Sequence, residues 1–242
     1  MMLGLPPKIR SISGSERAIG RTLPVPGDGL QGRSGFGENR HRASLRTGPP
    51  ACSIVRAMTR SFRFSVQASA PRPAAEWREL GRRAEDLGYS ALSVSDHLDA
   101  EMAPLIALAV TAEATRDLRL TTLVLGNDFR HPLFLAKQAA TLDLLSDGRL
   151  ELGLGAGWKT SDYDQSGISL DSPGVRIARL AESVEILKRS FAEGSFDFDG
   201  EHYTVRGHDG QPTCIQSPHP PFLLAGGGKK MLTLAAREAD IV

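Results

Sequence analysis

Strand-like and helix-like patterns alternate along the chain from residue 62 to residue 242, and this alternation restricts the fold more than any other feature. Patterns typical of strands occur at 62–67, 90–95, 118–125, 150–155 and 221–225, and a sixth begins at residue 240. Patterns typical of helices occur between them at 74–87, 104–116, 132–145, 173–193 and 229–239. Residues 196–205 are predicted as a hairpin that turns at Asp199 and Gly200. Regular alternation of this kind predicts a parallel sheet with helices packed against it.

The fourth predicted strand favours a closed barrel over an open sheet. Its three leucines share one face, and Glu151, Gly153 and Gly155 share the other. A central strand of an open parallel sheet is apolar on both faces, whereas a barrel strand tolerates glycine on its inner face beside a ligand. No G-x-G-x-x-G motif follows the first predicted strand, so a Rossmann cofactor site is not indicated. We therefore expect an α/β fold, specifically a (β/α)8 TIM barrel truncated after about six strands. A complete barrel takes ~250 residues, whereas residues 58–242 number 185.

The first 57 residues differ in composition from the rest of the chain. They hold nine Lys or Arg against three Asp or Glu, a net charge of +6, whereas the remaining 185 residues hold 20 against 25, a net charge of −5. Nine glycines, six prolines and no lasting hydrophobic period predict a disordered basic extension over 1–57, followed by the incomplete barrel domain over 58–242. Three origins of the extension stay open. It is an artefact of a start codon upstream of the natural start at Met58, an organellar leader, or a tail that binds nucleic acid.

Composition also narrows the classes of function. No apolar run approaches the ~18–20 residues of a membrane-spanning helix, so we expect no membrane partner. Cys52 and Cys214 lie far apart without metal-ligand spacing, which predicts no disulfide framework, no metal site and a cytoplasmic location. The whole-chain charge of +1 gives no support for a nucleic-acid partner. The expected partner is a small-molecule substrate, and a homodimer stays open.

Small and polar residues gather where the predicted strands end, and these ends form one rim of a parallel barrel. The four ends carry Asp96 and His97; Gly126, Asn127 and Asp128; Gly155 to Trp158; and Gly226 to Lys229. Glycines that lead into a helix, with a lysine beside them, are typical of an anion-binding cradle as well as of a flexible turn. His97 is a candidate catalyst or a loop residue, and Trp158 is a candidate wall for a flat ligand or ordinary packing. Together the four ends favour a functional site at this rim.

Four segments resemble the bacterial luciferase-like monooxygenase family. The longest is AKQAATLDLLSDGRLELGLGAGW at 136–158, and it is supported by ALSVSDH at 91–97, HPPFLLAGGG at 219–228 and AAREADIV at 235–242. The resemblance extends over about 62–242. The SDH sequence that ends the segment 91–97 is most similar to the branch of the family that uses the deazaflavin coenzyme F420.

The resemblance implies a luciferase-like TIM barrel whose mouth holds the cofactor ring. His97 matches the histidine that acts on the substrate proton, and is the expected catalytic residue. The segment near Gly126 and Asn127 matches the one that backs the ring, often through a non-prolyl cis peptide. Gly226 and Gly227 match a glycine pair whose amides hold the cofactor phosphate. The full set expected to bind the cofactor is Asp96, Gly126, Asn127, Gly157, Trp158, Gly226, Gly227 and Lys229.

The sequence also departs from the family pattern. Trp158 stands where some deazaflavin dehydrogenases carry an acidic residue, and no seventh or eighth strand pattern is present. The implied function is hydride transfer between coenzyme F420 and a small organic substrate. Two alternatives stay open: an FMN-dependent luciferase-like monooxygenase that uses oxygen, and a truncated, non-catalytic barrel that binds cofactor.

Overall fold

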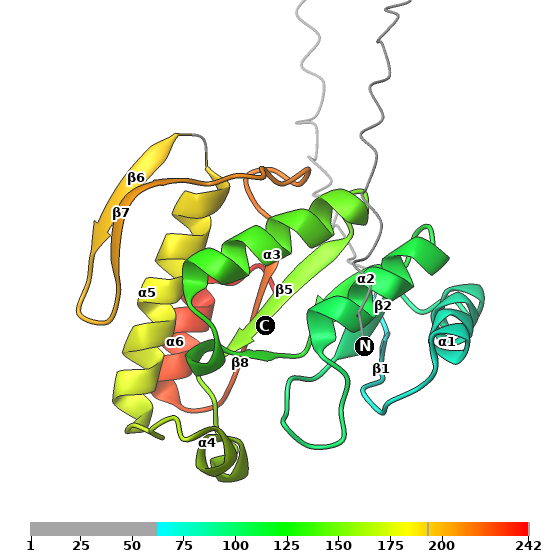
Figure 1. Cartoon of the computed structure of the whole chain (residues 1–242), viewed down its shortest axis with the longest axis horizontal. Coiled ribbons are helices and arrows are strands. Elements are labelled where there is room, and N and C mark those ends of the chain that lie inside the picture. Colours follow the sequence, from blue (N-terminus) through cyan, green and yellow to red (C-terminus); the bar gives the residue numbers. More distant parts are fainter. Residues whose placement is uncertain (1–61, 193, 242) are drawn as a thin grey trace, which may run out of the picture. The chain divides into compact units, whose positions relative to one another are not determined.

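The predicted parallel sheet is present in the computed structural model, which describes residues 62–192 and 194–241 (Figure 1). Its strands are β1 (Ser65–Gln67), β2 (Ala91–Val94), β3 (Arg119–Thr122), β4 (Leu125–Gly126), β5 (Leu150–Gly155) and β8 (Phe222–Ala225). β1, β2, β3, β5 and β8 lie side by side in chain order and all pair in parallel, and the short β4 also pairs with β5. A doubly wound sheet reverses its strand order, so this order is that of a barrel. The disordered extension predicted over 1–57 lies outside the described residues.

The predicted helices are present with similar bounds. They are α1 (Ala74–Asp86), α2 (Pro104–Ala114), α3 (Pro132–Leu145), α5 (Pro173–Phe191) and α6 (Lys229–Glu238). Proline occupies the first turn of α2, α3 and α5, where its missing N–H costs no helical hydrogen bond. The predicted sixth strand appears as a single parallel bridge between Leu223 and Ile241.

One further helix, α4 (Thr160–Ser166), was not predicted. Its sequence, TSDYDQS, has no apolar period, so the usual signal for a helix is missing. Only Asp162 and Tyr163 of this helix are buried. The helix ends at Gly167, whose left-handed backbone suits glycine.

β5 has the two faces that its sequence predicts. Its three leucines are fully buried in the core that the sheet forms with the helices. On the other face, a Cβ at Gly153 would lie 1.8 Å from the carbonyl oxygen of Thr122, so only glycine fits there. Glu151 on that face accepts hydrogen bonds from Arg63 Nη2 at 2.5 Å, Arg119 Nε at 2.6 Å and Thr121 Oγ1 at 2.8 Å. The inner face of β5 is therefore polar at its start and glycine-rich at its end.

The turn between α3 and β5 explains part of the long signature segment. Asp147 and Gly148 both have positive φ, of 53° and 73°, and the buried Arg149 follows them. The Arg149 guanidinium donates to the carbonyl oxygens of Ser146 at 2.7 Å, Leu118 at 3.0 Å and Ala112 at 2.7 Å. These bonds tie the ends of α2 and α3 to the start of β5, so the SDGR sequence has a structural role.

The predicted hairpin is present but longer than predicted. Its antiparallel strands are β6 (Ser195–Asp199) and β7 (Thr204–Asp209), which form a separate two-stranded sheet beside α5 (Figure 1). The Glu182 carboxylate on α5 accepts hydrogen bonds from the backbone N–H groups of residues 201, 202 and 203 at 2.8–3.1 Å. This side chain fixes the hairpin turn to the helix.

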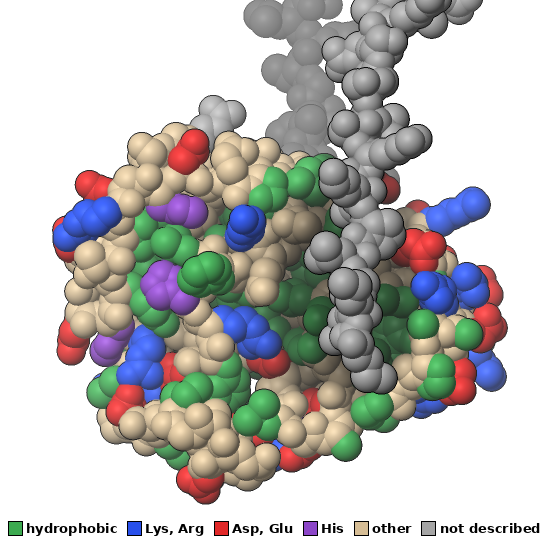
Figure 2. All heavy atoms as spheres, viewed as in Figure 1, with side chains coloured by type: hydrophobic (Ala, Val, Ile, Leu, Met, Phe, Trp, Pro, Cys, Tyr) green, Lys and Arg blue, Asp and Glu red, His purple; other side chains and the backbone are tan. Residues whose placement is uncertain are grey.

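Basic and acidic side chains are interspersed on the face shown in Figure 2. Over 62–192 and 194–241, no helix has both the length and the apolar character needed to span a bilayer. The same described residues contain no group of three or more His, Cys, Asp or Glu side chains arranged to hold a metal ion.

Candidate active site at the carboxyl ends of the strands

A cavity of about 490 Å³ lies where β2, β4, β5 and β8 end, with α4, α5 and α6 completing its walls. This volume is within the range of small-molecule sites, ~300–1,000 Å³. Seven of the nine predicted site residues line it: Asp96, His97, Gly126, Gly157, Trp158, Gly226 and Gly227. They come from four strand ends that are far apart in the sequence, as the barrel arrangement predicts.

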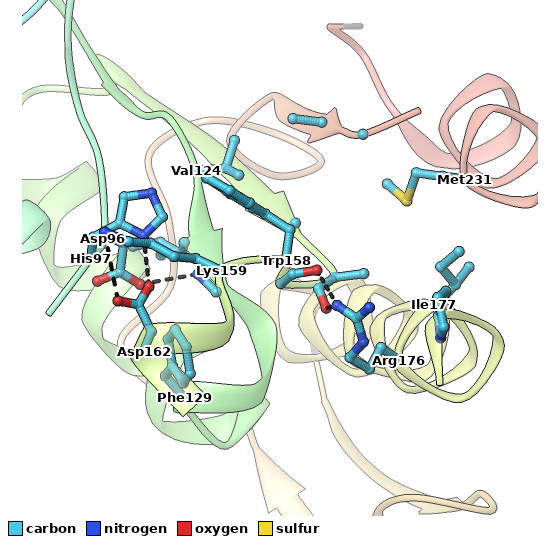
Figure 3. A pocket seen from close by; sticks show the side chains of 18 of the residues that line it. Asp96, His97, Val124, Phe129, Trp158, Lys159, Asp162, Arg176, Ile177 and Met231 are labelled. Carbon is cyan, nitrogen blue, oxygen red and sulfur yellow. Dashed lines mark hydrogen bonds and ion pairs between the residues drawn. The ribbon is translucent and has the colours of Figure 1, made fainter. Parts of the chain in front are cut away.

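His97 follows β2 and is held by two carboxylates. Its Nδ1 lies 2.7 Å from Oδ2 of Asp162 on α4, and its backbone N–H donates to Oε2 of Glu101 at 3.3 Å. Nε2 has no hydrogen-bond partner within the described part of the chain. Trp158 packs edge-on against the imidazole with the ring centroids 5.7 Å apart, and Figure 3 shows the two rings on the same side of the cavity.

Asp96 lines the cavity, but its carboxylate is bound by the chain's own donors. Arg130 binds both oxygens, at 2.5 and 2.7 Å, and the backbone N–H of Gly126 donates to Oδ2 at 3.0 Å. Asp96 therefore braces the loop after β2 against the segment after β4. The cofactor contact that the sequence predicts for Asp96 stays a prediction, since the residue also lines the cavity.

The segment between β3 and η1 (Asn127–Phe129) forms one wall of the cavity through Leu123, Val124 and Gly126. A non-prolyl cis peptide occurs here, between Leu123 and Val124, slightly before the predicted position. Asn127 does not line the cavity, because η1 turns its side chain into the protein, where Nδ2 donates to the Tyr203 hydroxyl at 3.3 Å.

Three glycines form the opposite rim, between β8 and α6. Gly226 and Gly228 have positive φ, of 151° and 83°, and both Gly226 and Gly227 line the cavity. A Cβ at Gly227 would have no atom within 4 Å, so open space adjoins this backbone. Gly228 is the N-cap of α6, and helix N-termini favour anions. Lys229 is exposed and is not among the residues that line the cavity, so its predicted cofactor contact stays a prediction.

Sequence reasoning missed the residues that α4 and α5 contribute. Tyr163 lines the cavity, and its hydroxyl donates to Oδ2 of Asp128 at 2.9 Å. Burial and this hydrogen bond raise the pKa of Tyr163 to about 12, so it stays a neutral donor. Gly157 has a φ of 76°, and a Cβ there would lie 1.8 Å from the Tyr163 hydroxyl. The available signal for its burial in the sequence was that Tyr163 is the only aromatic residue in the polar segment 160–166.

Arg176 on α5 supports the rim after β5. Its buried guanidinium donates to the carbonyl oxygens of Ala156, at 3.1 Å, and of Gly157, and to that of Asp171 at 2.9 Å. Figure 3 shows the guanidinium of Arg176 next to Trp158, with Ile177 and Met231 on the far side of the cavity. One end of the cavity is therefore polar, around His97, and the other is largely apolar.

A sequence model described as luciferase-like monooxygenase matches residues 57–242. Two curated relatives are the F420-dependent glucose-6-phosphate dehydrogenases of Mycolicibacterium smegmatis, 32% identical over 191 residues, and Amycolatopsis mediterranei, 29% identical over 187 residues. The matches cover 74% of this chain and 54% and 55% of the relatives, respectively. The chain thus spans about half the length of the curated relatives it matches.

A solved structure with a similar fold is the coenzyme F420 dependent tetrahydromethanopterin reductase from Methanopyrus kandleri. It superposes with a TM-score of 0.68 at 24% identity, over 74% of this chain and 54% of the reductase. This likeness, with the parallel strand order, confirms the predicted α/β barrel fold. Because the family's sequence pattern covers the whole of the described sheet and cavity, the chain belongs to the luciferase-like monooxygenase family.

Proposed function

We propose that this cavity binds the deazaflavin coenzyme F420 and that the protein transfers a hydride between F420 and a small organic substrate. The observation that carries the proposal is the composition of the cavity, with a histidine at one end and an open glycine rim at the other. F420-dependent dehydrogenases among the relatives support the choice of cofactor. A small-molecule substrate and a cytoplasmic location are parts of the same proposal.

The residues present fit such a cofactor. The backbone at Gly227 adjoins open space at the N-terminus of α6, where a phosphate can approach the N–H groups without meeting a side chain. Val124, Ile177 and Met231 offer apolar walls for a ring. When bound, F420 supplies a ring that accepts or donates a hydride.

The chain's own groups then have separate tasks. The unpartnered Nε2 of His97 takes the proton that leaves a substrate hydroxyl as the adjacent carbon loses a hydride, and returns it in the reverse direction. Trp158 packs beside the imidazole and Val124 lines the same cavity, so both restrict how a substrate can approach His97. Asp96 and Arg130 hold the β2 and β4 loops at a fixed separation.

Two other readings of the same cavity remain distinct hypotheses. The family's description as luciferase-like monooxygenase favours FMN with oxygen as a second candidate. A barrel that binds cofactor without catalysis is the third candidate.

Fluorescence titration of the full chain with F420 and, separately, with FMN tests the proposal. We expect F420 to bind at least tenfold more tightly than FMN and to quench the emission of Trp158, which is 73% exposed at the rim. A Trp158→Phe variant identifies the source of the quenching, because Trp77 is fully buried elsewhere. Preference for FMN supports the monooxygenase, and binding of neither cofactor overturns the proposal.

A further inference from the structure

Asp162 has a contact with His97 that the proposed reaction does not yet use. Its carboxylate is buried, with a side-chain exposure of 2%, and Oδ2 lies 2.7 Å from Nδ1 of His97. The other oxygen, Oδ1, accepts from the backbone N–H of Leu98 at 3.3 Å and lies 4.0 Å from Nζ of Lys159. Figure 3 shows the carboxylate between the imidazole and the lysine.

These contacts determine which imidazole nitrogen carries the proton. An ionised carboxylate accepts hydrogen bonds and cannot donate one, so Nδ1 must be the donor in this pair. The neutral imidazole then has its available lone pair on Nε2, and no described residue forms a hydrogen bond with that nitrogen. The ring orientation is fixed on its other side by Trp158.

We propose that Asp162 is a positioning residue that holds His97 as the Nδ1–H tautomer and presents an unprotonated Nε2 to the cavity. The role of this nitrogen in proton transfer rests on the proposed function. The tautomer is a property of the chain alone, and it can be measured without cofactor or substrate.

The other charged groups near His97 are engaged elsewhere. Lys159 pairs with Asp99, and this hydrogen bond raises the pKa of the lysine and lowers that of the aspartate. Glu101 binds the backbone N–H of His97 and the Ser95 hydroxyl at 2.9 Å. Among the carboxylates that surround His97 in the described residues, Asp162 is therefore the one that contacts the ring.

The fold supplies Asp162 through α4. The helix begins directly after the Trp158 rim, and Asp162 lies in its first turn, where its N–H donates to the carbonyl of Lys159 at 3.0 Å. Gly157 allows Tyr163 to approach the rim, because any side chain there would occupy the position of the Tyr163 hydroxyl. The close packing of α4 against the rim thus places Asp162 beneath His97.

Nuclear magnetic resonance of the 15N-histidine-labelled full chain tests the tautomer, at a pH where the imidazoles are neutral. The signals of His97 are identified by their loss in a His97→Gln variant. We expect the proton on Nδ1 and a deprotonated Nε2. A wild-type His97 with its proton on Nε2 overturns the proposal, whatever the variants show.

An Asp162→Asn variant should reverse the tautomer. Leu98 N–H and Lys159 both lie on the Oδ1 side, so the amide oxygen faces them and the NH₂ group faces His97 Nδ1. His97 must then accept at Nδ1 and carry its proton on Nε2. Asp164→Asn is the matched control, because it removes the same charge from an exposed position of α4.

Turnover separates this inference from the proposed function. We expect kcat with F420 to fall roughly 10–100-fold in Asp162→Asn, with KM little changed, and to be unchanged in Asp164→Asn. A reversed tautomer with no F420 binding in any variant rejects the proposed function and leaves the positioning role intact. A retained Nδ1–H tautomer in a folded Asp162→Asn variant contradicts the positioning role.

Discussion

At the scale of single residues, His97 combines two properties that proton transfer requires. Its orientation is fixed by Asp162 at Nδ1 and by the edge-on contact with Trp158. Its other nitrogen is unpartnered within the described residues, and the side chain is a quarter exposed at the cavity. A histidine that only filled space would not need this combination.

Replacement of His97 by glutamine should lower turnover with F420 strongly and leave F420 binding almost unchanged. Glutamine keeps a hydrogen-bonding group of similar size but cannot exchange a proton near neutral pH. A positioned acid–base residue contributes roughly 10²–10⁴-fold to rate, so we expect a loss in that range. Steady-state kinetics and a binding titration measure the two effects. A loss below about tenfold would assign His97 to pocket shape alone.

Replacement of Gly227 by valine tests the phosphate cradle. A Cβ at this position would have no atom within 4 Å, so we expect the fold to persist while the added methyl groups occupy the space beside the backbone. We expect F420 affinity to fall by about tenfold or more, since ~1.4 kcal/mol of lost contact gives that factor. Ala236→Val, on the exposed face of α6, is the control. Equal affinity in both folded variants would remove the cradle from the site.

The sequence predicted part of the site because strand ends converge in a parallel barrel. His97, Gly157 and Gly227 could be named from their positions directly after strand patterns. Asp162 could not, because it comes from a polar helix without hydrophobic period. Asn127 was placed at the cofactor, but the turn η1 directs its side chain inward, and a turn of this kind leaves no periodic signal.

At the scale of elements, the connections are held by side chains that bind backbone groups. Glu85 near the end of α1 accepts hydrogen bonds from the N–H groups of residues 116, 117 and 118, at 2.7–3.2 Å. These groups lie in the loop between α2 and β3. Burial alone would raise the pKa of Glu85, but the three backbone donors outweigh burial and lower the pKa.

Replacement of Glu85 by glutamine should therefore destabilise the protein in a pH-dependent manner. The lowered pKa means that the stabilisation is present above the ordinary value of 4.5 and is lost as the pH falls through the folded-state value. We expect the free energy of unfolding to decrease by about 1–3 kcal/mol at pH 7, with a smaller difference below pH 4.5. Denaturant unfolding at both pH values measures this, with the exposed Glu79→Gln as the control. A pH-independent difference would contradict the assigned cause.

The elements themselves were predicted better than their ends. The bounds of α3 and β5 match the prediction, because proline, glycine and a strong hydrophobic pattern mark them. The segment 118–125 was predicted as one strand but divides into β3 and β4, with two residues between them that line the cavity. Its run of Leu, Thr and Val, interrupted only by Arg119, contains no glycine or proline that would mark this division.

At the scale of the whole sheet, Glu151 connects three segments across the inner face. It accepts from Arg63 ahead of β1, from Arg119 and Thr121 on β3, and itself belongs to β5. Its side chain is 4% exposed, whereas Arg63 and Arg119 are 50% and 28% exposed. Burial of the Glu151 carboxylate costs solvation free energy, and all of its hydrogen-bond donors are needed to offset that cost.

Replacement of Glu151 by glutamine should consequently destabilise the entire sheet rather than one loop. The amide has one acceptor oxygen for three donors, and its NH₂ group would face cationic side chains. We expect a loss of about 1–3 kcal/mol in the free energy of unfolding, and reduced hydrogen-exchange protection in β1, β3 and β5 together. Glu113→Gln breaks an exposed pair with Arg78 at 3.2 Å and should cost less than ~1 kcal/mol. Of the two carboxylates compared, only Glu151 bridges strands of the described sheet. Equal losses in the two variants would therefore contradict the prediction, because they would make the inner-face carboxylate no more important than a surface ion pair.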